Sequence, residues 1–277
     1  MCELFCFNSD NPKQINNALE CFYSHSERHP HGWGLANIKS DGYFIDKEPV
    51  KASESEHLND ILSSPIVGKN VFAHIRLATM GKLVTSNCHP FTERDNNGRC
   101  WVLMHNGTIF DYPKLDEYAQ KQKGTTDSEK ILLFIVDKIN DFENEKGDLL
   151  TAEERFKLIE DIIIDMSFNN KLNIMISDGE MTYVHTNMKD SLHYIRDGNA
   201  LYVTSCPLND AKNWKCVELN RIYGLKDGKI MFKSEDHGNE FVFTEKHEKI
   251  IQEALKSIDK DLYEKLMEEI ENNSLSF

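Results

Sequence analysis

The chain has 277 residues, of which 40% are hydrophobic, and this length is enough for one large hydrophobic core or two modest ones. Its 46 acidic and 32 basic residues give a formal net charge of -14, and such a field repels nucleic-acid backbones and anionic lipid. No apolar run reaches the length of a membrane span or of a signal-peptide core. We therefore expect a cytoplasmic protein with no nucleic-acid or membrane partner.

The first third of the chain is expected to be mostly extended. Residues 2–7 are strand-like, and Asp10-Asn11-Pro12 is typical of the N-terminal cap of a helix that would continue through Ile15, Leu19 and Phe22. A hairpin is expected around the turn at residues 39–42. The strands predicted in this part lie at 33–38, 43–46, 70–78 and 100–105.

Two long helices are predicted next, at residues 126–144 and 151–168, because apolar residues recur there at three- and four-residue spacing. Three Asp-Gly turns then indicate an antiparallel meander. Its strand pairs are 173–176 with 181–185, 192–195 with 201–204, and 221–225 with 230–232. The chain closes with a charged amphipathic helix at 245–272, which could lie on its own domain or on a second copy. Its apolar stripe is Ile251, Leu255, Ile258, Leu262, Leu266 and Ile270.

The order of strands, two helices and strands again favours an α+β fold in which antiparallel sheets pack against helices. No linker divides the chain, so one globular domain with a C-terminal appendage is expected. The seven cysteines are an odd number without a C-x-x-C pair, which fits neither a disulfide framework nor a zinc ribbon. His29, His31 and Cys88-His89 have no standard metal-site spacing, so no metal site is predicted.

Cys2 is a candidate nucleophile. Removal of Met1 would place a thiol and a free α-amine on one residue, and the amine could then accept the thiol proton without help from a histidine. Cysteine at position 2 is small enough for the initiator methionine to be removed. Taken alone, an early cysteine is more often a small buried hydrophobic residue. Other parts of the chain decide between these alternatives.

Arg76 lies in a strand whose alternation separates two faces. Val71, Ala73, Ile75 and Leu77 should share one face, and Phe72, His74 and Arg76 the other. Arg76 is therefore expected deep in the fold. A buried guanidinium needs a carboxylate, which can come from a neighbour in a structural ion pair or from a ligand.

Two further segments have both a structural and a catalytic interpretation. Asn106-Gly107 follows an apolar strand, where it suits a hairpin turn or, with a side-chain amide and a backbone N–H, an oxyanion hole. Thr126 and Glu129 have capping-box spacing, and Asp127 falls in the first helical turn, where negative charge is favourable. Only in combination with the other motifs is Asp127 a candidate partner for a ligand ammonium group.

Together, four motifs resemble the class II glutamine amidotransferase domain. In chain order they are Cys2, the His-x-Arg-x-Ala-Thr sequence around Arg76, Asn106-Gly107, and the Thr-Asp-Ser-Glu sequence around Asp127. Further likeness is found in residues 31–36, 87–91 and 205–208. The resemblance implies an N-terminal-nucleophile hydrolase: a four-layer αββα sandwich of two antiparallel sheets over residues 2–243, followed by a C-terminal amphipathic helix and tail over 244–277.

The resemblance also implies roles for individual residues. Cys2 would attack the side-chain amide of glutamine, its α-amine would carry the proton, and Asn106 with Gly107 would bind the oxyanion. The implied substrate-binding residues are Arg76 for the α-carboxylate, Thr79 beside it, Asp127 for the α-ammonium group, and Trp33 with Gly34 in the pocket floor. No metal or organic cofactor is required.

The chain departs from the pattern at His31 and Met80, so neither is given a catalytic role, and too few residues follow Asp127 for an attached synthase domain. It is most similar to the stand-alone branch, which includes γ-glutamyl hydrolases. We expect an amidohydrolase for glutamine or a γ-glutamyl compound. The alternatives are an ammonia-supplying subunit of a separate synthase, and a non-catalytic binding module if Met1 is retained. The oligomeric state is open, and the C-terminal helix is compatible with a homodimer. Residues 92–99 and 205–213 are expected to select the leaving group.

Overall fold

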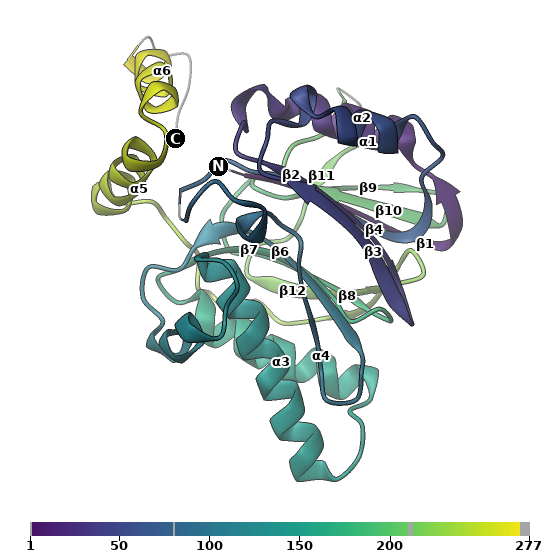
Figure 1. Ribbon diagram of the computed structural model, residues 1–277. Coiled ribbons are helices and arrows are strands. Elements are labelled where there is room, and N and C mark those ends of the chain that lie inside the picture. Colours follow the sequence, from purple (N-terminus) through teal and green to yellow (C-terminus); the bar gives the residue numbers. More distant parts are fainter. Residues whose placement is uncertain (1, 80, 210–212, 272–277) are drawn as a thin grey trace.

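Two antiparallel β-sheets lie face to face, and helices cover the outer side of each (Figure 1). The computed structural model describes residues 2–79, 81–209 and 213–271. The arrangement confirms the α+β class and the αββα sandwich expected from the sequence. Within this described part, no helix combines the length and the apolar composition that crossing a membrane would require.

The first sheet has the strand order β11-β9-β10-β1-β4-β2-β3. Its strands are β1 (Glu3–Gln14), β2 (Trp33–Lys39), β3 (Gly42–Glu48), β4 (Val67–Ile75), β9 (His193–Asp197), β10 (Ala200–Thr204) and β11 (Lys215–Cys216). The helices on its outer side are α1 (Asn16–Ser24) and α2 (Glu56–Leu62). The 3-10 helix η1 (His25–Arg28) follows α1, and the 3-10 helix η2 (Ala52–Glu54) precedes α2.

The second sheet has the order β13-β12-β8-β7-β6-β5. Its strands are β5 (Phe91–Arg94), β6 (Cys100–Thr108), β7 (Lys171–Ser177), β8 (Thr182–Thr186), β12 (Arg221–Lys226) and β13 (Lys229–Lys233). The long helices α3 (Asp127–Lys146) and α4 (Ala152–Ser167) cover it, as predicted. Two 3-10 helices complete this half: η3 (Thr85–Asn87) and η4 (Pro113–Gln120).

Strand alternation divides the hydrophobic core into three layers. On β1, Phe5 and Phe7 point toward α1, whereas Leu4 and Cys6 point into the space between the sheets. The third layer lies between the second sheet and helices α3 and α4. The predicted alternation of β4 is confirmed, because Val71, Ala73 and Ile75 belong to the helix-side layer and Phe72 to the layer between the sheets.

The start of the first helix differs from the sequence prediction. Asp10-Asn11-Pro12 lies inside β1, and α1 begins only at Asn16. The ladder between β1 and β4 is interrupted between Asn8 and Lys13. Pro12 falls within that interruption, where its missing N–H costs no ladder hydrogen bond. The local residues suit a helix cap, but pairing with neighbouring strands keeps them extended.

The three Asp-Gly turns connect strand pairs as predicted, but they do not form one continuous meander. β7 pairs with β8 and β12 with β13 in the second sheet, while β9 pairs with β10 in the first. The chain therefore crosses from one sheet to the other and back. This crossing follows from burial: β10 places Leu201 and Val203 between the sheets, where they pack with residues of both.

The C-terminal helix is divided into α5 (Glu245–Ile258) and α6 (Lys260–Glu271), which project from the layered body (Figure 1). Asp259 between them has φ -146° and ψ 95°, so it is not helical. Ile251 and Leu255 of the predicted apolar stripe are buried. The side chains of Leu262, Leu266 and Ile270 lie outside the described part of the structure.

Candidate active site

Cys2 precedes β1 and is held between the ends of two strands from different sheets. Its Sγ lies 3.3 Å from the carbonyl oxygen and 3.4 Å from the amide nitrogen of Leu77, just past β4. On the other side, Asn106 Nδ2 in β6 donates to the carbonyl oxygen of Cys2 at 2.5 Å. The structure thus brings Cys2, the segment that carries Arg76, and Asn106 together.

Asn106 and Gly107 lie inside a strand and not in a hairpin turn. β6 continues to Thr108, with Asn106 opposite Asn173 and Gly107 opposite Leu172 of β7. A Cβ atom at position 107 would stand 1.9 Å from the carbonyl oxygen of Lys171. Glycine is therefore required by the close approach of the two backbones, and the hairpin interpretation is wrong.

Arg76 is buried, with 2% of its surface exposed, next to the Cys2 contact. Its Nη1 donates to the carbonyl oxygen of Lys82 at 3.1 Å. Burial lowers the pKa of Arg76 from its ordinary value, and the thiols of Cys2 and Cys88 act in the opposite direction. A charged fork held here by an uncharged acceptor can also bind a ligand carboxylate.

Asn87, to which the sequence analysis gave no role, connects the Arg76 segment to the start of α3. Its Nδ2 donates to the same Lys82 carbonyl oxygen at 2.9 Å, and its Oδ1 accepts from the backbone N–H of Thr125 at 2.7 Å. Asn87 is fully buried. Its place in the motif at 87–91 was the one feature of the sequence that could have indicated this position.

Asp127 is the first residue of α3, with 8% of its surface exposed. Its Oδ2 accepts from the backbone N–H of Ile109 at 2.9 Å, which attaches it to the segment after Gly107. The capping box is only half formed: Thr126 accepts from the backbone of Glu129, but the Glu129 carboxylate accepts from the N–H groups of residues 123–124. A carboxylate at this helix N-terminus is favourable and can meet a ligand ammonium group.

The pocket-floor pair is separated by strand alternation. Trp33 packs in the helix-side core and its indole N–H donates to Glu48 at 3.2 Å, so it lies on the face of the sheet opposite to Cys2. Gly34 lies on the inner face, where a Cβ atom would stand 1.8 Å from the carbonyl oxygen of His89. Thr79 is partly buried and follows the Cys2-contacting segment directly. Gly34 therefore shares the inner face of the sheet with Cys2, Thr79 follows the segment that contacts Cys2, and Trp33 lies on the outer face.

A pair of stacked histidines lies behind this region. The rings of His74 and His89 have centroids 4.2 Å apart and an interplanar angle of 28°. Their four ring nitrogens are buried and have no hydrogen-bond partner among the described residues. Burial lowers the pKa of both rings well below the ordinary histidine value, and nearby charged groups contribute in the same direction. Both imidazoles are therefore neutral at pH 7.

Lys171, at the start of β7, is a second residue that the sequence analysis missed. Its side chain is 1% exposed, and its Nζ lies 5.7 Å from the ring centroid of Phe243. Burial lowers the pKa of Lys171 to about 7, and the nearby Cys2 thiol opposes this shift. A lysine between a helix and a strand is usually exposed, so no pattern in the sequence indicates this buried environment.

Of the two predicted selection loops, the structure places one far from the site. Residues 92–94 belong to β5, and residues 95–99 form the loop beyond the last pair of β5 and β6, Arg94 with Cys100. Asn106 is at the other end of β6, about 20 Å away at the usual rise per residue. The loop at 205–213 begins beside the nucleophile, since Ser205 Oγ accepts from the backbone N–H of Leu4 at 2.7 Å. Residues 210–212 lie outside the described part.

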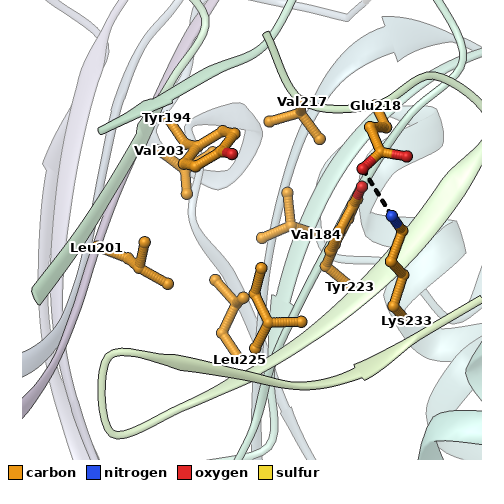
Figure 2. A pocket seen from close by; sticks show the side chains of 10 residues that line it. Val184, Tyr194, Leu201, Val203, Val217, Glu218, Tyr223, Leu225 and Lys233 are labelled. Carbon is orange, nitrogen blue, oxygen red and sulfur yellow. Dashed lines mark hydrogen bonds and ion pairs between the residues drawn. The ribbon is translucent and has the colours of Figure 1, made fainter. Parts of the chain in front are cut away.

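A cavity of about 110 Å³ lies elsewhere between the two sheets (Figure 2). Its lining consists of Val184, Tyr194, Leu201, Val203, Val217, Glu218, Tyr223, Leu225, Ile230 and Lys233. Lys233 forms an ion pair with Glu218 at 2.6 Å, which Figure 2 shows beside Tyr223. The lining contains no predicted site residue, so this apolar cavity is separate from the Cys2 region.

The model of the family described as "Glutamine amidotransferases class-II" matches residues 1–200. The chain belongs to this family. It is 31% identical over 203 residues to an uncharacterized Methanocaldococcus jannaschii protein, a match that covers 71% of this chain and 54% of that protein. A Haemophilus influenzae protein that carries the provisional name glutamine amidotransferase is 29% identical over 199 residues, covering 70% of this chain and 65% of that protein.

This class II amidotransferase chain thus spans about half to two thirds of the length of those two relatives. Its fold is also similar to a solved structure, the glutamine phosphoribosylpyrophosphate amidotransferase of B. subtilis, with a TM-score of 0.61 and 17% identity. That likeness covers 86% of this chain and 49% of the other. At this identity it supports the N-terminal-nucleophile hydrolase fold alone, and it agrees with the two antiparallel sheets.

Proposed function

We propose that this amidotransferase cleaves the γ-amide of glutamine or of a γ-glutamyl compound through a thioester on Cys2. The observation that carries the proposal is the position of Cys2. Its Sγ contacts Leu77, next to Arg76 on the first sheet, while its carbonyl group accepts from Asn106 on the second. A nucleophile, a buried cation and an amide donor therefore converge from separate elements, as amide hydrolysis requires.

Binding of the glutamyl group uses the two charged residues. The Arg76 fork would hold the α-carboxylate, with Thr79 beside it, and Asp127 would hold the α-ammonium group. Asn87 fixes the spacing between these two halves, because it bonds both to the carbonyl that Arg76 uses and to the residue before the α3 cap. A zwitterion held at both charges presents its γ-amide in a defined direction, which lowers the entropic part of the barrier.

In the chemical step, the Cys2 thiolate attacks the γ-carbonyl carbon after the α-amine has taken the thiol proton. The oxygen that becomes negative would be bound by the Asn106 side-chain amide and the Gly107 N–H. Collapse of the tetrahedral intermediate breaks the C–N bond of the substrate. The protonated α-amine of Cys2 returns its proton to the departing amine. Water then cleaves the thioester by the same route and releases glutamate. The α-amine exists only if Met1 is removed, which is part of the proposal.

The sequence of steps needs no metal and no organic cofactor. We assign it to residues 2–243 as the amidotransferase domain, with residues 244–277 as an appendage. Arg76 and Asp127 select only the glutamyl end of the substrate. Glutamine, glutathione and other γ-glutamyl amides share that end, so the leaving amine is selected by other residues.

Replacement of Cys2 with alanine tests the proposal. Glutamate release from glutamine and from a panel of γ-glutamyl compounds is measured for the wild type, Cys2→Ala and the control Cys21→Ser, whose thiol is exposed. The expected result is a fall in kcat of at least about 1,000-fold for Cys2→Ala, with the control unchanged. Full activity in Cys2→Ala on every compound that the wild type hydrolyses would refute the assignment.

A further inference from the structure

A second cluster of reactive side chains lies on the other face of the N-terminal strand. Glu3, His25 and Cys206 each place a metal-ligating atom within 4.8 Å of the other two. They come from β1, η1 and the segment after β10. Because Glu3 is next to Cys2 in an extended strand, its side chain points to the opposite side of the sheet. The cluster is therefore distinct from the proposed catalytic groups.

Contacts of the backbone and of the side chains hold this cluster in place. His25 Nδ1 lies 2.9 Å from Glu3 Oε2, and these side chains are 25% and 14% exposed. Cys206 is fixed beside β1 because the neighbouring Ser205 donates its N–H to Leu4 at 3.0 Å. Cys206 as a residue is open to solvent, at least in part. An ion could thus reach a group of ligands that is largely assembled.

We propose that Glu3, His25 and Cys206 bind one Zn²⁺ ion. A thiolate, an imidazole and a carboxylate are the three ligand types that Zn²⁺ accepts, whereas Mg²⁺ and Ca²⁺ prefer oxygen alone. Ligand atoms around tetrahedral Zn²⁺, with bonds of about 2.0–2.3 Å, lie roughly 3.3–3.8 Å apart. The present separations, 2.9 Å between His25 Nδ1 and Glu3 Oε2 and no more than 4.8 Å for the other pairs, bracket that range. Binding of Zn²⁺ displaces the thiol proton of Cys206 and any proton on the His25 ligand nitrogen. These protons pass to solvent.

His29 is the fourth candidate ligand. Its Nδ1 is bonded to the backbone carbonyl of His25 at 3.0 Å, and its Nε2 lies 3.9 Å from Glu3 Oε1. Donation of the second ring N–H to a backbone carbonyl is the usual arrangement for a metal-bound histidine, because it fixes the tautomer and the ring orientation. With His29 the site would be closed, and without it a water molecule would complete the tetrahedron.

A bound Zn²⁺ would fasten the start of β1 to η1 and to the segment after β10. The residue immediately before Glu3 is the proposed nucleophile, so the ion would restrain the position of Cys2 without contacting the substrate. The ligands at positions 3, 25 and 206 have no regular spacing in the chain. This is why the sequence predicted no metal site.

Zinc binding is tested on the full-length protein after chelator treatment, by competition of ZnCl₂ with a chromogenic chelator and by thermal unfolding with and without ZnCl₂. The variants are Cys206→Ser and His25→Ala, and the matched control is Cys216→Ser, which removes another exposed thiol. One equivalent of Zn²⁺ is expected, with affinity reduced at least about tenfold in both cluster variants and unchanged in the control. Co²⁺ should give a thiolate-to-cobalt absorption band in the wild type and in Cys216→Ser, and Cys206→Ser should lack it.

A further variant, Cys2→Ala, separates this site from chelation by an N-terminal cysteine, whose thiol and amine can themselves bind Zn²⁺. Retention of one equivalent in Cys2→Ala supports the proposal. Equal zinc affinity in the wild type and Cys206→Ser, or loss of binding in Cys2→Ala alone, would overturn it. Neither result depends on glutamyl hydrolase activity.

Discussion

His31 and Asp259, which are separated by 228 residues in the chain, meet with Nε2 and Oδ2 2.9 Å apart. The other ring nitrogen, Nδ1, accepts from the backbone N–H of Ala78 at 2.8 Å. The imidazole is therefore the tautomer that carries its proton on Nε2. Burial lowers the pKa of His31, and Asp259 opposes this shift. This contact attaches the junction of α5 and α6 to the segment that follows Arg76.

Asp259→Ala should lower the free energy of unfolding by about 1–2 kcal/mol, because it leaves a buried imidazole N–H without its acceptor. Asp259→Asn should lose less, since its side-chain carbonyl can still accept. Urea denaturation measures both, with the exposed Asp261→Ala as the control. A loss in Asp259→Ala no greater than in Asp261→Ala would mean that the contact does not hold the C-terminal helices.

Asn106→Ala should lower kcat for glutamate release by about 100- to 1,000-fold with little change in KM, because the amide would act on the oxyanion and not on the bound substrate. Steady-state kinetics with the best γ-glutamyl substrate measure the two constants separately. The exposed Asn96→Ala is the control and should match the wild type. A raised KM with an unchanged kcat would instead place Asn106 in substrate binding.

Gly107→Ala should destabilise the fold by about 1–3 kcal/mol, since its Cβ would overlap the carbonyl oxygen of Lys171 and force β6 away from β7. Gly42→Ala is the matched control, because a Cβ there meets no atom within 4 Å. Thermal and urea unfolding give the comparison. If the two alanine variants were equally stable, the close approach of the strands at Gly107 would not constrain the residue type.

Lys171→Met tests the buried ammonium group. The folded pKa of about 7 is below the ordinary lysine value of about 10.4, so between these pH values the unfolded chain holds a proton that the folded chain lacks. Stability should therefore rise with pH across this window, by at most about 1.4 kcal/mol per pH unit, and the cost of burial is fully present below pH 7.

The readout is the free energy of unfolding in urea from pH 6.5 to 9.5. The wild type should gain stability over this range relative to Lys171→Met, while the exposed Lys189→Met should follow the wild type. Parallel curves for the wild type and Lys171→Met would show that the folded protein keeps this lysine charged.

Much of the fold follows from the sequence because local pattern and burial agree. The alternation on β4 predicts the inward face of Arg76, and the spacing of apolar residues predicts α3 and α4. The prediction fails where tertiary pairing outweighs local preference. Asp10-Asn11-Pro12 has the residues of a helix cap, yet β1 continues through it. Asn106-Gly107 has the residues of a hairpin turn, yet both pair within β6.

The candidate site shows a similar division. The motifs identify Cys2, Arg76, Asn106 and Asp127, but motif order does not specify on which face of its strand a neighbouring side chain lies, and Trp33 points away. The roles of Asn87 and Lys171 depend on contacts with distant segments. Such contacts have no periodicity along the chain, so only the structure places these residues beside the site.

The central claim is that Cys2 is the nucleophile and carries a free α-amine. The most direct test is intact-mass and peptide analysis of the active protein after reaction with a diazoketone analogue of glutamine, which alkylates a nucleophilic thiol with loss of N₂. We expect a chain without Met1 that gains one adduct, on Cys2, and that excess glutamine protects. Active protein that retains Met1, or an adduct on any other cysteine, would contradict the claim.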